Sequence, residues 1–162
     1  MAGGPISPTS IFHTDTAGRT FMGFYAGGGG NIAAQDFGIQ VKASLDADSV
    51  VQLRFPMPPA IPTGTLKLLL RALANATTGA AKFQVSDGTA GSGTSPSAVS
   101  LTAETASTIT WASGGADKYN DTKVTLSAAP GANDDLVVAL KFQTSGWTLA
   151  QIMTALVTVL WE

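Results

Sequence analysis

The sequence predicts an all-β protein, an antiparallel β-sandwich preceded by an extended N-terminal arm. From residue 49 onward, successive segments alternate apolar and polar residues with a period of two, the signature of half-buried strands. Clusters of turn-forming residues separate these segments at short intervals. Because the strands are short and no long helical pattern interrupts them, we expect two antiparallel sheets packed face to face.

Residues 1–48 differ from the rest of the chain. They contain glycine and proline, including consecutive glycines at 27–30, and show no sustained periodicity. Aromatic side chains spaced along such a segment need a surface on which to pack, on their own domain or on a neighbouring subunit. We therefore expect an arm or long loops over 1–48 and a sandwich domain over 49–162. The expected anchors of the arm at an interface are Phe12, Phe21, Phe24, Tyr25 and Phe37.

Each alternating segment from residue 49 also indicates which of its side chains face the core. On a strand, successive side chains point to opposite faces, so the apolar members of each run share the buried face. The predicted core positions are Val51, Leu53, Phe55, Leu66, Leu68, Leu70, Ala81, Phe83, Val85, Ile109, Trp111, Val124, Leu126, Leu136, Val138, Leu140, Phe142, Ala155, Val157, Val159 and Trp161.

A proline-rich segment separates the first two of these strands. Half of the chain's eight prolines lie within residues 56–62, between the run that ends near Phe55 and the run that begins after Gly64. Proline has no N–H to donate to a neighbouring strand, so the first strand must stop there. The segment predicts a stiff corner at which the chain crosses from one sheet to the other.

Composition excludes several classes of function. The net charge is −2 and no basic cluster is present, which argues against a nucleic-acid partner. No continuous apolar segment is long enough to span a membrane, and the N-terminus lacks the features of a signal peptide. Charged residues make up only 12% of the chain, so its surface is easily desolvated. Such a surface is typical of a protein that packs against other proteins, and equally of a neutral secreted β-protein.

The residues that an active site requires are mostly missing. His13 is the only histidine and cysteine is absent, so a catalytic or zinc-binding cluster lacks its usual members. The aspartate pairs Asp46/Asp48 and Asp134/Asp135 match no calcium-loop spacing, and we expect them to cap turns. We therefore expect no enzyme activity, no cofactor and no metal.

The three tryptophans offer one candidate ligand contact. Trp111 and Trp161 alternate with polar positions, as core residues do. Trp147 lies in a glycine-flanked turn, so we expect it to be exposed and available to stack on a sugar ring.

Several segments of the chain carry a family resemblance. They are a strand running into a proline-rich corner (VQLRFPMPP), a strand after a glycine (GTLKLLLRA), a short strand after a Thr-Gly turn (TTGAAKFQV), a strand after a Pro-Gly turn (NDDLVVALKF) and a final strand (TALVTVLWE). In this layout the chain from Ser49 to Glu162 resembles small virion proteins of tailed bacteriophages that fold as jelly-roll β-sandwiches. Residues 1–48 fall outside the resemblance.

The resemblance implies a non-enzymatic structural protein of a bacteriophage virion. Its expected role is that of a decoration (cement) protein on the capsid surface, with the major capsid protein as partner and a homo-oligomer, a trimer, as the assembly. The alternatives are a tail-fibre or baseplate component, or another glycan-binding β-sandwich module. For these, the expected contact surface is Trp147 with the loops at 86–97 and 113–121.

Overall fold

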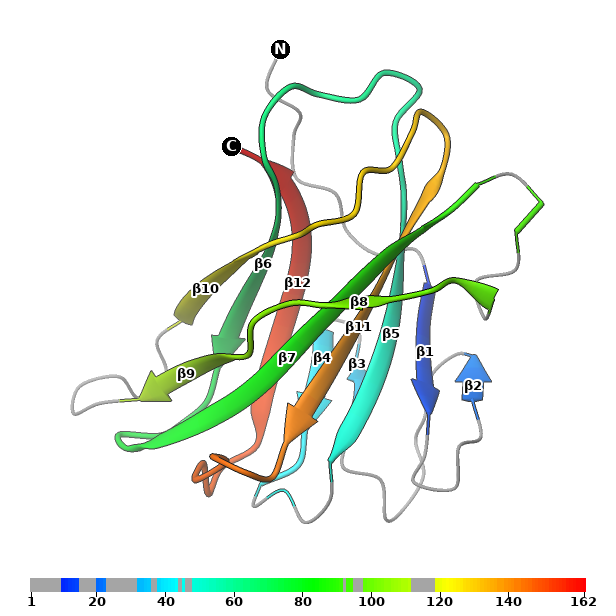
Figure 1. The fold of residues 1–162 in the computed structure, drawn as a ribbon. Coiled ribbons are helices and arrows are strands. Elements are labelled where there is room, and N and C mark those ends of the chain that lie inside the picture. The colour runs from blue at the N-terminus through cyan, green and yellow to red at the C-terminus, as the bar shows by residue number, and fades with distance from the viewer. Residues whose placement is uncertain are drawn as a thin grey trace.

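The computed structural model describes residues 10–14, 20–22, 32–35, 38–43, 45, 48–91, 93–94, 98–111 and 119–162. These residues form two antiparallel β-sheets packed face to face (Figure 1). The predicted β-sandwich of jelly-roll type is therefore confirmed. Within the same residues, no helix has the length and apolar character needed to cross a membrane.

The larger sheet has seven strands in the described part of the chain. Their order is β2-β1-β5-β11-β7-β8, and β9 also pairs with β7. The strands are β1 (Ser10–Thr14), β2 (Thr20–Met22), β5 (Ser49–Pro56), β7 (Gly79–Ala90), β8 (Thr102–Ala103), β9 (Ser107–Trp111) and β11 (Asp135–Gln143).

The smaller sheet has five described strands, in the order β10-β6-β12-β4-β3. They are β3 (Ile32–Gln35), β4 (Gly38–Val41), β6 (Leu66–Leu73), β10 (Tyr119–Thr125) and β12 (Met153–Trp161). In Figure 1, β10, β6 and β12 form one layer and β7, β11 and β5 form the other.

The core lies between the two sheets and consists of the inward side chains of both. All of the predicted core positions are buried, and those of β5 alternate with half-buried residues as far as Phe55. Leu53 of β5, Leu68 of β6 and Val159 of β12 are each 0% exposed. Full burial of one such side chain contributes about 1.5–3 kcal/mol, so this row of contacts holds the sheets together.

The proline-rich corner carries the chain from one sheet to the other, as the sequence predicts. It joins β5 of the seven-stranded sheet to β6 of the five-stranded sheet. The amide of Met57 donates to the carbonyl oxygen of Asp134 (2.8 Å), which ties the start of the corner to the segment before β11. At its end, Thr65 and Glu162 exchange backbone hydrogen bonds of 2.7 and 3.1 Å.

The N-terminal region differs from the expected arm in its described residues. Strand β1 pairs with β5, and β4 pairs with β12, so both belong to the sandwich. Ile39, Val41 and Leu45 are part of the hydrophobic core. These strands have only three to five residues each, too few for a period of two to stand out from a glycine-rich background.

Of the five aromatic residues expected to anchor the arm, the structure describes two. Phe12 and Phe21 occupy strand positions in β1 and β2, opposite Gln52 and His13 respectively. Phe24, Tyr25 and Phe37 lie outside the described residues. The role of these aromatic residues at an interface stays a prediction.

Candidate functional site

One sheet surface brings aromatic, charged and apolar side chains together. It is the outer face of strands β10, β6 and β12, named here the β6–β12 face. Its residues alternate with the buried ones along each strand. They are Tyr119, Asp121 and Lys123 on β10; Lys67, Leu69, Arg71 and Leu73 on β6; Thr154, Leu156, Thr158 and Leu160 on β12; and Glu162 after β12.

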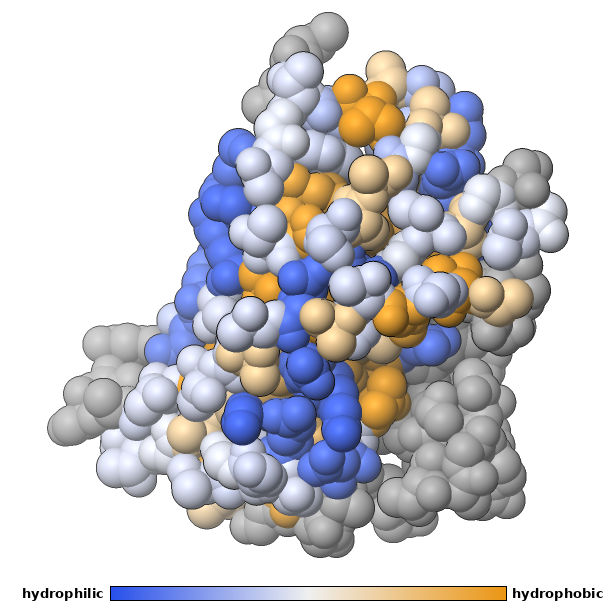
Figure 2. Space-filling model, viewed as in Figure 1, coloured by the Kyte–Doolittle hydropathy of each residue, from blue (hydrophilic) through white to orange (hydrophobic). Residues whose placement is uncertain are grey.

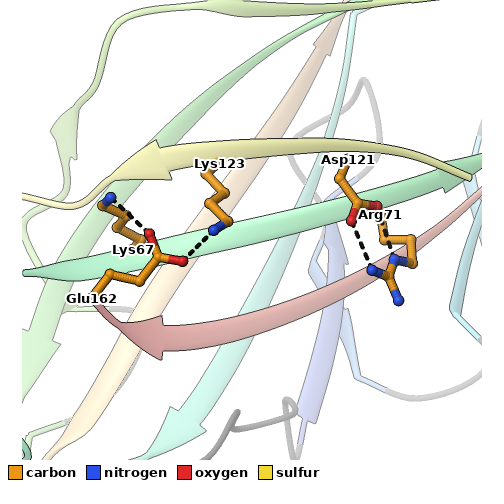
Figure 3. A network of polar contacts seen from close by, with 5 residues as sticks. All are labelled: Lys67, Arg71, Asp121, Lys123 and Glu162. Atoms are coloured by element: carbon orange, nitrogen blue, oxygen red, sulfur yellow. Dashed lines mark hydrogen bonds and ion pairs between the residues drawn. The ribbon is translucent and has the colours of Figure 1, made fainter. Parts of the chain in front are cut away.

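A two-point ion pair stands at the middle of this face. Arg71 and Asp121 are directly opposite each other in the β10–β6 pairing. The Arg71 Nε donates to Asp121 Oδ1 (2.8 Å), and Arg71 Nη2 donates to Asp121 Oδ2 (2.7 Å), as Figure 3 shows. The hydrogen bonds from Arg71 lower the pKa of Asp121, and the same contact raises the pKa of Arg71. Two hydrogen bonds between the same two groups restrict their relative orientation.

Tyr119 lies next to this pair and is the most exposed large hydrophobic residue of the described chain, at 59%. It sits opposite Leu73, which places it diagonally across from Arg71. The guanidinium carbon of Arg71 lies 5.5 Å from the centre of the tyrosine ring. This cation–π contact restricts the ring while much of its surface remains open to solvent.

A second polar group, formed by Lys67, Lys123 and Glu162, lies at the end of the face where β12 ends. Glu162 Oε2 accepts a hydrogen bond from Lys67 Nζ (2.9 Å), and Glu162 Oε1 forms an ion pair with Lys123 (Figure 3). The two lysines, first Lys123 and then Lys67, lower the pKa of Glu162. Figure 2 shows hydrophilic residues along the left rim of the molecule, where β10 and the end of β12 lie.

Leucine side chains lie among the two polar groups: Leu69 stands between Lys67 and Arg71 on β6, and Leu73 follows Arg71. On β12, Leu156 lies opposite Arg71 and Leu160 opposite Lys67. Leu69 and Leu73 on β6 and Leu156 and Leu160 on β12 are only partly buried, although they point away from the core. A sheet face turned to water normally carries polar residues at such positions. The β6–β12 face therefore combines apolar contact area with fixed hydrogen-bonding groups, which is the composition of a binding surface.

The side chains of this face offer polar groups and an aromatic ring. Its side chains supply hydrogen-bond donors, acceptors and one aromatic ring, but no histidine or thiol. Among the residues that the structure describes, no three histidine, aspartate or glutamate side chains come together as a metal site would require.

The expected exposure of Trp147 is wrong. The side chain is 9% exposed, and its ring packs edge-to-face on Phe142 with centroids 6.0 Å apart. Its Nε1 donates to the carbonyl oxygen of Leu149 (3.1 Å). After the glycine-flanked turn, the amides of Thr148 and Leu149 both donate to the carbonyl oxygen of Ala80. These hydrogen bonds bring the chain back over the end of the core rather than out into solvent. Trp147 as a glycan contact is not favoured by this position.

The aspartates act as turn caps and ion-pair partners. Asp134 Oδ2 accepts from the amide of Gly131 (2.8 Å), as predicted for a turn cap. Asp48 Oδ1 accepts from the amide of Thr144 (2.8 Å), and that hydrogen bond is the main reason that the pKa of Asp48 is lowered. Asp135 pairs with Arg54 across β11 and β5. Asp46 lies outside the described residues, and His13 lies on β1 opposite Val51.

Sequence reasoning missed Tyr119, Arg71 and Asp121 as a group. Arg71 and Asp121 are 50 positions apart in the chain. Only the pairing of β10 with β6 brings them together, and no local pattern records that pairing. The available signal was the alternation itself, which places Arg71 on an outward position.

No protein-family model matches the chain, and no curated protein matches it either. Solved structures do share its fold. The carbohydrate-binding module TmCBM27, described for specific mannan recognition, aligns with 100% of this chain and 97% of its own, at a TM-score of 0.50 and 6% identity. The family 11 carbohydrate-binding module from Clostridium thermocellum aligns at 0.42 and 12% identity over 96% of this chain and 97% of its own. The module TmCBM61 aligns at 0.38 and 8% identity over 76% and 70%. The likeness to TmCBM27 supports the β-sandwich fold and, at this identity, the fold alone.

Proposed function

We propose that this protein is a glycan-binding β-sandwich module and that the β6–β12 face is its binding surface. The observation that carries the proposal is the exposed ring of Tyr119 beside the Arg71–Asp121 pair, whose orientation is fixed by two hydrogen bonds. The fold is shared with a module described for mannan recognition, which is consistent with this role.

The physical basis is the fit between this face and a sugar. A pyranose ring has an apolar face of C–H groups that packs on an aromatic ring, and hydroxyl groups around its edge that both donate and accept hydrogen bonds. Asp121 supplies acceptors and Arg71 supplies donors. Because the pair is already ordered in the unbound protein, less side-chain entropy is lost on binding than with mobile side chains.

The proposal is tested by titrating the full chain with a panel of soluble oligosaccharides, including mannan- and galactan-derived ones, by calorimetry. Loss of one stacking contact costs about 0.5–1.5 kcal/mol, so Tyr119→Ala should weaken binding by about 2- to 10-fold. Ile152→Ala is the control, because this residue is 56% exposed and precedes β12 without belonging to the face. Binding that Tyr119→Ala and Arg71→Ala both leave unchanged would contradict the proposal.

Capsid decoration is the second candidate function. The partly buried leucines of the β6–β12 face and the low share of charged residues, 12%, favour a surface that packs against another protein. In this proposal the major capsid protein is the partner and the protein acts as a trimer. Leu156→Asp should then abolish binding to particles, and mass spectrometry of particles should give a simple ratio of this chain to the shell subunit. A ratio of only a few copies per particle would speak for the tail and its glycan receptor instead.

A further inference from the structure

A carboxyl group is buried in the core-facing row of β7. Asp87 continues the inward positions of Phe83 and Val85 and is 1% exposed, the only charged side chain among the buried residues of the described chain. Its Oδ2 accepts a hydrogen bond from the amide of Ala128 (2.6 Å). Its Oδ1 has no hydrogen-bond donor among the described groups. A buried acceptor without a partner is costly, so this oxygen needs an explanation.

The neighbour of Asp87 is a second carboxyl group. Glu104 follows β8, and its backbone amide donates to the carbonyl oxygen of Val85 (2.8 Å), which fixes it beside β7. Its Oε1 accepts from the amide of Ser127 (3.0 Å), and its carboxyl is within hydrogen-bonding reach of Asp87. Two carboxylates that face each other are both acceptors. A hydrogen bond between them therefore requires one proton on the pair.

Within the described part of the chain, no lysine or arginine acts on the Asp87 carboxyl. Val138 on β11 and Thr102 on β8 lie opposite it in the two strand pairings, and Ala128 contributes its backbone amide. These three residues carry no titratable side chain, whereas Glu104 does. Burial raises the pKa of Asp87 to about 6, and the negative charge of Glu104 acts in the same direction. The hydrogen bond from Ser127 lowers the pKa of Glu104, so the proton resides on Asp87.

We propose that Asp87 and Glu104 share one proton and form an acid-strengthened latch that ties residues 126–128 to the β7–β8 edge of the seven-stranded sheet. In the protonated latch, Asp87 Oδ1 carries the proton and donates it in a hydrogen bond to the Glu104 carboxylate. When the pH rises, the proton leaves to solvent and two like charges remain next to each other, that of Asp87 in a buried position.

The latch lies where the chain crosses between the sheets. Residues 126–134 connect β10 of the five-stranded sheet to β11 of the seven-stranded sheet (Figure 1). Both carboxyl groups hold backbone amides at the start of this crossing. Opening of the latch would release the amides of Ser127 and Ala128, which directly follow β10 and Leu126.

The sign of the pH dependence follows from the raised pKa. A carboxyl that binds its proton more tightly in the closed state stabilises that state below its ordinary pKa, and the contribution is lost as the pH rises through the closed-state value. The latch is therefore strongest near pH 4 and weakest above pH 7. A difference of about two pKa units corresponds to a change of about 100-fold in the opening equilibrium over this range.

The experiment uses the full chain in two NMR measurements. A ¹³C titration of the side-chain carboxyls should show Asp87 titrating near pH 6, well above the exposed aspartates. Hydrogen exchange at the amides of Ser127 and Ala128, corrected for the intrinsic pH dependence of exchange, should show opening that increases up to about 100-fold between pH 4 and pH 7.5. An Asp87 carboxyl that titrates below pH 4.5 would overturn the proposal even if no variant folds.

Three variants complete the test. Asp87→Asn replaces the shared proton with a permanent amide donor and should remove the pH dependence of exchange between pH 5 and pH 7.5. Glu104→Gln should lower the pKa of Asp87 toward its ordinary value. Asp48→Asn, the matched control at an exposed carboxyl on another part of the sandwich, should leave the dependence in place. A pH dependence that survives Asp87→Asn would refute the latch. So would thermal stability that rises with calcium and falls with a chelator at constant pH, because a cation rather than a proton would then join the carboxylates.

Discussion

Replacing Trp147 with alanine is expected to destabilise the sandwich by about 3–5 kcal/mol, the usual cost of truncating a large aromatic residue in a core. The change removes the edge-to-face contact with Phe142 and leaves the carbonyl oxygen of Leu149 without the indole donor. For a domain of this size, each kcal/mol lowers the midpoint of thermal unfolding by about 2–4 °C, so a loss of about 6–20 °C is expected.

The assay is chemical unfolding followed by far-UV circular dichroism, because the substitution itself alters tryptophan fluorescence. Ile152→Ala is the control at an exposed position and should change the free energy of unfolding by less than about 0.5 kcal/mol. A Trp147→Ala variant that loses less than about 1 kcal/mol would refute the reasoning, since it would mean that this side chain is not part of the core.

The remaining predictions concern β7 and the β6–β12 face. Gly88→Ala would place a methyl group 2.5 Å from the carbonyl oxygen of Ser100, so we expect a loss of about 1–3 kcal/mol in denaturant unfolding. Gly91→Ala is the matched control, because its methyl group would meet only an ordinary contact at 3.6 Å, and an equal loss in both variants would contradict the packing argument. Arg71→Met should let the pKa of Asp121 rise to its ordinary range, measurable by NMR titration. The stability that this exposed pair contributes is small, because solvent screens it. It is present above about pH 4 and lost as the pH falls, so the variant should show a weaker acid dependence. An unchanged Asp121 titration would refute that assignment.

Strands β5, β6, β7, β11 and β12 were predictable because their alternation is long. Strand β5 runs over Ser49–Pro56 and β6 over Leu66–Leu73, where the sequence places them, and their inward residues are the predicted ones. The crossing between sheets was predictable for a related reason, since proline cannot continue a paired strand.

Other features depend on contacts between distant parts of the chain. Strand β4 is held by its pairing with β12, which lies more than a hundred residues later, so its four residues carry little local signal. Trp147 has the sequence surroundings of a loop, but its burial is decided by Phe142 and Leu149. Residues 99–101 cover Gly88 on β7, where the absence of a side chain makes room for them.

The candidate site also depends on contacts between distant parts of the chain, and the sequence predicted only part of it. Alternation alone placed Arg71, Leu69 and Leu156 on outward positions. It gave no indication that β10 pairs with β6, and therefore none that Tyr119 and Asp121 would stand beside Arg71. The composition of a binding face arises from the strand order, and strand order in an antiparallel sandwich is set by packing between segments far apart in sequence.

The most direct test of the glycan-binding proposal is a map of backbone amide shifts as the labelled chain is titrated with the oligosaccharide that binds best in the panel. The proposal predicts shifts concentrated in Lys67–Leu73, Tyr119–Thr125 and Met153–Trp161, the strands of the β6–β12 face. In Tyr119→Ala the same shifts should need about 2- to 10-fold more oligosaccharide. Shifts centred instead on β5, β7 and β11 would contradict it, as would the absence of shifts with every glycan in the panel.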